Sequence, residues 1–192
     1  LRAPWFDVSC CPPNVARPFA SLSSYIATVD DEGVQVHQYA PAEIRTTLPD
    51  GRPVGIDLET DYPREGVIRV IVRGDSAEPW TLSLRVPAWA EGATLQDGSG
   101  VVAASPGMVQ VSRAFRDGDV IELTLPLAPR FTVPDARIDA IRGCVAIERG
   151  PEVLALESVD LGADVGGVAI DTSVAPREHD GAVWVSVRAL DP

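Results

Sequence analysis

The sequence predicts an all-β fold, built of β-sandwich domains and preceded by one helix. Two observations predict the strands. Apolar residues recur at every second position in many short segments, which is the period of a strand with one buried face. Turn signals rich in glycine, proline and aspartate separate these segments at intervals of about 8–12 residues, as in a sandwich. A third observation predicts the helix, because only residues 14–29 have a helical period.

The predicted helix carries one apolar stripe with spacings of four, three and four residues. The stripe consists of Val15, Phe19, Leu22 and Ile26. Asn14 is placed to cap this helix. Pro18 would remove a backbone hydrogen bond inside it, so the regular helix either begins near Arg17 or is kinked there. One helix cannot bury such a stripe alone, so we expect it to pack on the sandwich or in a helical domain.

The predicted strands are short runs in which apolar and polar residues alternate between turn residues. They cover residues 34–39, 54–58, 67–72, 80–86, 109–111, 121–125, 144–147, 153–156 and 183–187. Asp117 and Gly118 form a sequence typical of a hairpin turn, which predicts that the strands at 109–111 and 121–125 pair. The glycine-rich residues 162–167 predict a flexible loop.

Charge and hydropathy exclude two classes of partner. The chain has 192 residues, of which 16 are basic and 28 acidic, so its net charge is −12. Such a charge disfavours a nucleic-acid partner. No stretch reaches the roughly 20 apolar residues of a membrane span. We therefore expect neither nucleic acid nor a membrane, and three cysteines are too few for a disulfide scaffold.

The most distinctive motif is Cys10-Cys11-Pro12-Pro13-Asn14, directly before the predicted helix. The dipole and free N–H groups of a helix N-terminus favour a thiolate, which is a strong nucleophile and a soft ligand for zinc. The spacing alone favours another interpretation, in which both cysteines are small buried apolar groups. Two adjacent thiols also leave a zinc site incomplete, because zinc takes four ligands.

Five segments resemble the β-L-arabinofuranosidases of glycoside hydrolase family 127. Two of them adjoin or contain the cysteine motif: residues 5–17 (WFDVSCCPPNVAR) and 20–26 (ASLSSYI). The others follow in the family's order: residues 80–89 (WTLSLRVPAW), 115–119 (FRDGD) and 142–151 (RGCVAIERGP). The cysteine motif is highly specific, whereas each of the others is weak alone.

The resemblance implies an (α/α)6-barrel catalytic domain followed by β-sandwich domains. It implies a retaining exo-glycosidase that releases L-arabinofuranose from β-linked arabinosides and holds one zinc ion through three cysteines and a glutamate. By position, Cys10 matches the nucleophile and a zinc ligand, and Cys11 matches a second zinc ligand. The acid/base glutamate and the other ligands match no residue here, so the chain alone is expected to be inactive.

The resemblance also divides the chain. Residues 1–30 would be the end of the barrel with its last helix, 31–133 a β-sandwich, and 134–192 a second, truncated β-rich region. The chain is accordingly expected to be part of a longer protein. Reduced thiols suggest a cytoplasmic location. Two alternatives stay open: a stand-alone β-sandwich that only binds carbohydrate or a partner chain, and a chain that completes its site with a separately encoded barrel.

The remaining candidates have plain structural interpretations. Cys144 is expected to be a small buried residue within a strand, and His179 a solvated loop residue. His37 is expected to be a partly exposed strand residue, although it could point toward a sugar pocket. Trp5 could line the barrel mouth. The other tryptophans, Trp80, Trp89 and Trp184, are expected to pack in a core or between domains.

The acidic residues Asp57, Glu59 and Asp61 form a cluster that could suggest calcium. The cluster lacks the glycine-centred loop and the distant glutamate of an EF-hand. A solvated strand edge is the better interpretation.

Overall fold

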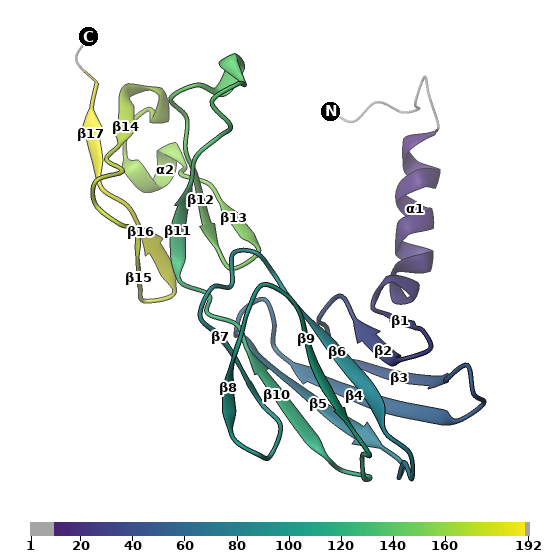
Figure 1. Ribbon diagram of the computed structural model, residues 1–192. Coiled ribbons are helices and arrows are strands. Elements are labelled where there is room, and N and C mark those ends of the chain that lie inside the picture. Colours follow the sequence, from purple (N-terminus) through teal and green to yellow (C-terminus); the bar gives the residue numbers. More distant parts are fainter. Residues whose placement is uncertain (1–9, 191–192) are drawn as a thin grey trace. The chain divides into compact units, whose positions relative to one another are not determined.

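The structure, a computed structural model, describes residues 10–190 (Figure 1). Strands predominate, as the sequence predicts, and the chain forms two compact units. The first unit comprises the residues up to Tyr62 together with Val67–Thr124. The second comprises Pro63–Gly66 together with the residues from Leu125 onward.

Helix α1 spans Cys11–Ser21 and continues into a 3-10 turn, η1, at Leu22–Tyr25. It therefore begins and ends earlier than the predicted residues 14–29. The N-cap is Cys10, so the expected capping role of Asn14 is wrong. The helix runs through Pro18, which has no N–H to donate to the preceding turn. None of its residues is buried, so the apolar stripe does not pack on the sandwich.

One sheet of the first unit has four strands in the order β1-β2-β6-β9. They are β1 (Ala27–Val29), β2 (Gly33–Val36), β6 (Trp80–Val86) and β9 (Gly107–Arg113). The β2 and β6 strands run parallel, and the other pairs are antiparallel. Gly33 lets the backbones of β2 and β6 approach closely, because a Cβ atom there would lie 2.0 Å from the carbonyl oxygen of Thr81.

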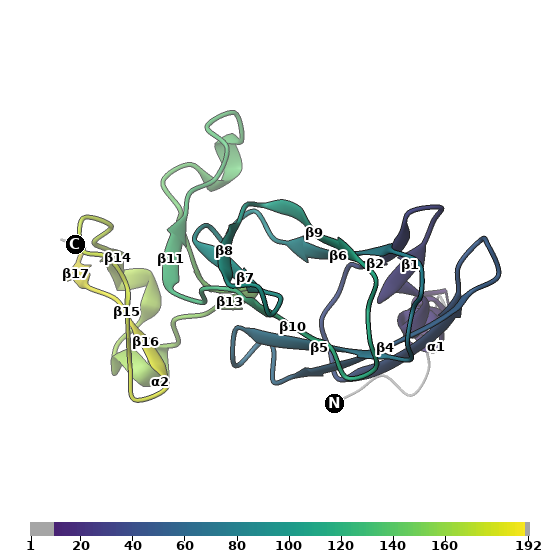
Figure 2. The same ribbon diagram turned by 60° about the horizontal axis from the view of Figure 1, so that its bottom comes forward.

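The other sheet has six antiparallel strands in the order β3-β4-β5-β10-β7-β8. They are β3 (Ala42–Thr47), β4 (Pro53–Thr60), β5 (Val67–Arg73), β10 (Val120–Thr124), β7 (Ala93–Gln96) and β8 (Val101–Ala104). The two sheets lie face to face and enclose the core (Figure 2). Fully buried residues come from both, among them Val34, Leu82, Ile68 and Ile121.

The predicted hairpin between residues 109–111 and 121–125 is wrong. The β9 strand pairs with β6, whereas β10 pairs with β5 and β7 in the other sheet. Gly118 does adopt a left-handed turn conformation, with φ of 83°. The turn therefore carries the chain between sheets. Phe115, buried just before it, packs against Trp80 with ring centroids 4.4 Å apart and ring planes tilted by 45°.

The second unit contains three small sheets and short helical turns. Its strands are β11 (Pro129–Thr132), β12 (Ala146–Arg149), β13 (Glu152–Leu154), β14 (Val168–Ile170), β15 (Arg177–His179), β16 (Ala182–Trp184) and β17 (Val187–Ala189). The helical segments are η2 (Asp139–Ile141), α2 (Ser158–Leu161) and η3 (Val165–Gly167). The predicted pair at 144–147 and 153–156 forms as β12 and β13, whereas residues 183–187 divide between β16 and β17.

Arg149 joins three segments of the second unit. Its Nε donates to Glu178 on β15 at 2.9 Å, and its guanidinium also donates to the backbone carbonyl of Arg64 at 3.2 Å. Leu125, Ile147 and Pro176 are the buried residues with apolar side chains in this unit, among those that the structure describes. Neither α1 nor α2 has the length and apolar content of a membrane-crossing helix.

Candidate functional site

The two thiols of the motif lie side by side at the start of α1. Cys10 is the N-cap and Cys11 the first helical residue, and their Sγ atoms are 3.8 Å apart. Both are free and exposed, which differs from the interpretation as small buried groups. An exposed thiol is open to a metal ion or to an electrophile.

The prolines change what the helix start can offer. Pro12 and Pro13 have no N–H, and the N–H of Asn14 donates to the carbonyl of Cys10 at 3.1 Å. The Cys10 side chain makes no capping bond. This helix start therefore has fewer unpaired N–H groups than most, so a thiolate here receives less support from backbone amides than the helix position alone predicts. What the prolines supply is a fixed φ on the two residues that follow the thiols.

The thiol separation fits two corners of a zinc site. Tetrahedral zinc with Zn–S bonds of about 2.3 Å places two sulfur ligands about 3.8 Å apart, and the Sγ atoms are separated by 3.8 Å. Residues 10–190 contain no group of three or more His, Cys, Asp or Glu side chains that could hold a metal. The donor set is thus suitable in type and spacing but comprises two of the four ligands that zinc takes.

A polar stripe and an apolar stripe run down different faces of α1. Arg17 donates from Nη1 to Oδ1 of Asn14 at 3.2 Å, and Ser21 donates to the carbonyl of Arg17 at 2.9 Å. With Cys10 these residues recur at spacings of four, three and four, so they share one face. The apolar stripe is exposed: Val15 is 56%, Phe19 74% and Leu22 49% accessible. Sequence reasoning missed the Arg17–Asn14 pair, although its i,i+3 spacing was the signal.

The other candidates from the sequence lie apart from the thiols in the chain. His37 follows β2 and is half-buried, and its Nε2 lies 2.7 Å from the hydroxyl of Thr28. Trp80 is buried in the core, as expected, and Trp89 is half-buried. Trp184 is 63% exposed, so of the two environments expected for it, a core or a contact between domains, it does not lie in a core. Trp5 lies outside the described residues.

Two further expectations are corrected. Cys144 is exposed and precedes β12, because the strand begins only at Ala146. His179 is exposed as expected, but it ends β15, and its Nε2 lies 3.2 Å from a carboxylate oxygen of Asp180. Neither residue belongs to a cluster of metal-ligating side chains among the described residues.

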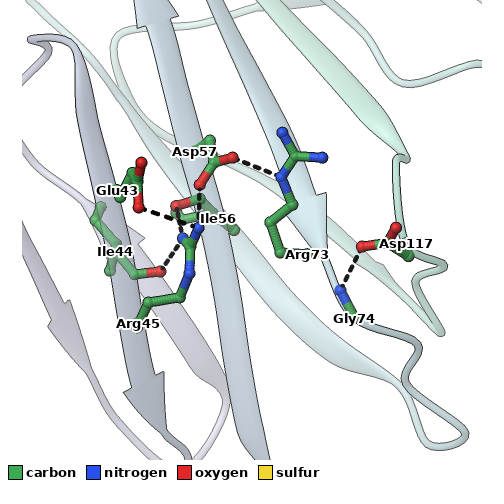
Figure 3. Close-up of polar contacts among 8 residues, drawn as sticks. All are labelled: Glu43, Ile44, Arg45, Ile56, Asp57, Arg73, Gly74 and Asp117. Carbon is green, nitrogen blue, oxygen red and sulfur yellow. Dashed lines mark hydrogen bonds and ion pairs between the residues drawn. The ribbon is translucent and has the colours of Figure 1, made fainter.

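The acidic cluster is neither a cation site nor a strand edge. Asp57 and Glu59 lie on β4, which has a neighbouring strand on each side. Arg45 approaches Oδ1 of Asp57 to 2.6 Å, and Arg73 donates from Nε to Oδ2 (Figure 3). The hydrogen bond from Arg73, followed by that from Arg45, holds the pKa of Asp57 below its usual value against the effect of burial. Glu59 pairs with Arg69 at 3.2 Å, so arginines occupy the positions that a cation would take.

Comparison with protein families gives two matches in sequence order. Residues 33–127 match the model of the GH127 β-L-arabinofuranosidase middle domain, and residues 129–186 match that of the glycoside hydrolase family 127 C-terminal domain. A curated relative, the non-reducing end β-L-arabinofuranosidase of Bifidobacterium longum subsp. longum, is 29% identical over 174 residues. The match covers 85% of this chain but 26% of that protein, so the chain spans about a quarter of its length.

Solved structures of glycoside hydrolases also match this chain. A GH127 β-L-arabinofuranosidase from Geobacillus stearothermophilus superimposes with a TM-score of 0.79 at 28% identity, over 97% of this chain and 35% of its own. A structure described as a glycoside hydrolase gives 0.79 at 27% identity, over 97% of this chain and 34% of its own. The fold, the two family models and the curated relative agree on one assignment. The chain belongs to glycoside hydrolase family 127, of which it represents the middle and C-terminal domains.

Proposed function

We propose that this chain is the C-terminal part of a zinc- and cysteine-dependent retaining glycoside hydrolase that removes terminal β-L-arabinofuranosyl residues. Membership in family 127 and the arabinofuranosidase activity by which two of the relatives are named support the reaction class. The observation that carries the proposal is the pair of exposed thiols at the start of α1, with their Sγ atoms 3.8 Å apart. The substrate is a saccharide with an arabinofuranoside at its non-reducing end.

Cys10 is the nucleophile in this mechanism. Its Sγ attacks the anomeric carbon on the side opposite the leaving oxygen, so that the C–S bond forms as the C–O bond breaks. An acid from the upstream domain protonates the leaving oxygen. The same group, now a base, takes a proton from water, whose oxygen then displaces Cys10 from the sugar. Two inversions at one carbon give net retention, with sulfur in place of the usual carboxylate.

Cys11 has a different role, because it stays beside the reacting sulfur as a ligand. Cys10 and Cys11 would hold zinc as neighbouring donors, which the 3.8 Å separation of their Sγ atoms permits. When bound, the metal keeps both thiols deprotonated at neutral pH. Pro12 and Pro13 limit backbone motion directly after the pair and so keep both sulfurs at the same end of the helix.

The chain alone is proposed to be inactive. The described residues supply two metal donors, and no third donor lies in a cluster with them. The apolar stripe of α1 is exposed, which supports the presence of a covering domain upstream in the complete enzyme. Phe19 is 74% accessible and shares the stripe with the exposed Val15 and Leu22, and a contiguous exposed apolar patch is typical of an interaction surface.

The proposal is tested by comparing the isolated chain with a fusion that carries an upstream catalytic domain. We expect no release of nitrophenol from an aryl β-L-arabinofuranoside by the isolated chain. We expect turnover after the chain is fused behind the barrel domain of the G. stearothermophilus relative. In that fusion, Cys10→Ser should lower kcat by at least about 10³-fold, because the weaker nucleophile also loses metal.

Cys144→Ser is the matched control, because Cys144 is likewise free and exposed but lies outside the motif. It should leave both turnover and zinc content unchanged. Turnover by the isolated chain, or an active fusion that tolerates Cys10→Ser, would contradict the proposal. Circular dichroism of each fusion shows whether the variant is folded, so that loss of fold is not counted as loss of chemistry.

A further inference from the structure

The two outer faces of the sandwich differ sharply in charge. On the outer face of the six-stranded sheet, called the charged face below, Arg45 and Arg73 flank Asp57 (Figure 3). On the same face, Arg69 lies 3.2 Å from a carboxylate oxygen of Glu59 and 3.9 Å from one of Glu122. Such a solvated network of ion pairs is ordinary protein surface. The outer face of the four-stranded sheet is built from other residue types, although the same chain of net charge −12 forms both.

The outer face of the four-stranded sheet, called the neutral face below, carries uncharged polar side chains from all four strands. They are Thr28, Gln35, Thr81, Ser83, Gln110 and Ser112, of which Ser83 is buried, with 2% of its surface accessible. Their strand neighbours, such as Val34, Leu82 and Val111, point into the core instead. Arg85 is the one charged side chain on this face within the four strands. Arg113 turns the other way, and its guanidinium lies 5.0 Å from the centroid of the Phe115 ring.

Four of these residues form one row across the whole sheet. Thr28 is opposite Gln35, Gln35 opposite Ser83, and Ser83 opposite Gln110. Neighbouring strands are about 4.8 Å apart, so the row is about 14 Å long. This length is comparable with that of a short oligosaccharide.

Hydrogen bonds along the row hold its side chains in fixed orientations. The hydroxyl of Thr28 donates to Oε1 of Gln35 at 2.9 Å, and Nε2 of Gln110 donates to the hydroxyl of Ser83 at 3.3 Å. A second row repeats the pattern, with the hydroxyls of Thr81 and Ser112 2.7 Å apart. His37 adds a ring nitrogen 2.7 Å from the Thr28 hydroxyl. Preorganised polar groups lose less side-chain entropy when a ligand binds.

Donors and acceptors remain free on this face. A carboxamide has two donor hydrogens and an acceptor oxygen. Gln110 is exposed, and its Oε1 accepts no hydrogen bond from any residue that the structure describes. A partner with many hydroxyl groups can use both kinds of group at once. A charged partner would find no counter-charge except Arg85, whereas a neutral partner covers the face without burying an unpaired ion.

We propose that the neutral face is a binding site for a neutral oligosaccharide, with Gln35 and Gln110 as its principal hydrogen-bonding residues. The site is separate from the thiol pair, whereas the choice of an arabino-oligosaccharide as its ligand rests on the function proposed above. The neutral face favours this ligand because its uncharged hydrogen-bond donors and acceptors match the hydroxyl groups of an uncharged sugar chain, whereas the charged face presents ion pairs. No aromatic side chain lies on the four strands' outward positions, so binding is weak and the face serves to hold substrate chains rather than to select them.

The test is a titration of the ¹⁵N-labelled chain with neutral arabino-oligosaccharides of three to five sugar residues. We expect a Kd on the order of 1 mM, with the largest shifts in the side-chain amides of Gln35 and Gln110. The double variant Gln35→Ala/Gln110→Ala should bind at least about tenfold more weakly. Glu43→Ala/Glu59→Ala on the charged face is the matched control and should bind like the parent chain.

Two further variants test whether binding occurs on the neutral face and independently of the thiol pair. Ser112→Glu places a charge on the neutral face, at an exposed position that tolerates it, and should abolish binding. Cys10→Ser should bind the oligosaccharide normally, which separates this site from the catalytic proposal. The inference is overturned if no shifts occur up to about 20 mM saccharide, if the shifts map to α1 or to the charged face, or if the control variant loses as much affinity as the glutamine variant.

Discussion

The hydroxyl of Tyr39 donates to the backbone carbonyl of Arg85 at 2.6 Å, across 46 positions of sequence. The bond ties the segment after β2 to β6. The ring of Tyr39 is buried and meets that of Tyr62 edge-on, with centroids 6.0 Å apart at 83°. One phenol thereby links three segments of the first unit.

Tyr39→Phe should lower the free energy of unfolding by about 1 kcal/mol, because it leaves a carbonyl without its donor and changes little else. Burial raises the pKa of Tyr39 well above its usual value. The folded state therefore favours the protonated phenol. The parent chain loses this contribution as the pH rises above about 10, the pKa of an unfolded tyrosine. Urea unfolding at pH 7 and pH 10.5 should show the parent and the variant converging at the higher pH, and a constant difference would contradict this.

Asp57→Asn should lower the free energy of unfolding by about 1–2 kcal/mol at pH 7, because Arg45 and Arg73 lose the carboxylate that they share. The pKa of Asp57 is lowered in the folded state, chiefly by the hydrogen bond from Arg73. Its contribution is therefore complete above the unfolded pKa of about 3.9 and is lost as the pH falls through the lower, folded value. Urea midpoints measured from pH 7 downward should fall more steeply for the parent than for the variant. Parallel curves would contradict the assigned pairing.

Gly33→Ala should destabilise the first unit by about 2–4 kcal/mol. The added Cβ would lie 2.0 Å from the carbonyl oxygen of Thr81, in backbone that cannot move without separating β2 from β6. Gly167→Ala is the matched control, because a Cβ there meets no atom within 4 Å, and it should change stability by less than about 0.5 kcal/mol. Thermal unfolding of both variants measures the difference, and equal midpoints would refute the close approach.

Phe19→Asp should reduce self-association of the isolated chain without changing the stability of the sandwich. Phe19 is 74% exposed on a helix none of whose residues is buried, so its removal costs no described contact. An exposed apolar stripe favours association. Light scattering across a concentration series, together with thermal unfolding, provides both readouts. Val153→Asp, at another exposed apolar residue, is the control and should leave association unchanged. An effect of Phe19→Asp on sandwich stability would contradict the account.

Much of the fold was predictable where the alternation of apolar and polar residues along a strand reflects the burial of one of its faces. The β4, β5, β6 and β10 strands alternate clearly because each buries one face in the core. The β3 strand was missed because its outward positions carry Glu43, Arg45 and Thr47, and Ile44 is the one large apolar residue among its three inward positions. The β7 and β8 strands were missed because alanines weaken their alternation. The hairpin error has another cause, since Asp117-Gly118 specifies a turn but not the sheet that the next strand joins.

The candidate functional residues likewise include some that the sequence identifies and some that it does not. Cys10 and Cys11 were identifiable because their neighbours in the sequence carry a specific motif. The neutral face was not, because Thr28, Gln35 and Gln110 become neighbours only through strand pairing. The burial of Cys144 was predicted wrongly, because its alternation with apolar neighbours extends beyond the true start of β12.

The most direct test of the central claim is to label the nucleophile. The fusion with the upstream barrel domain is treated with a cyclitol epoxide that has the configuration of L-arabinofuranose. Attack on the epoxide leaves a stable covalent bond at the attacking atom, and the labelled peptide is located by mass spectrometry. The account predicts one label, on the sulfur of Cys10, that excess arabinose suppresses and that Cys10→Ser removes. A label on a carboxylate, or on Cys11 or Cys144 instead, would contradict it.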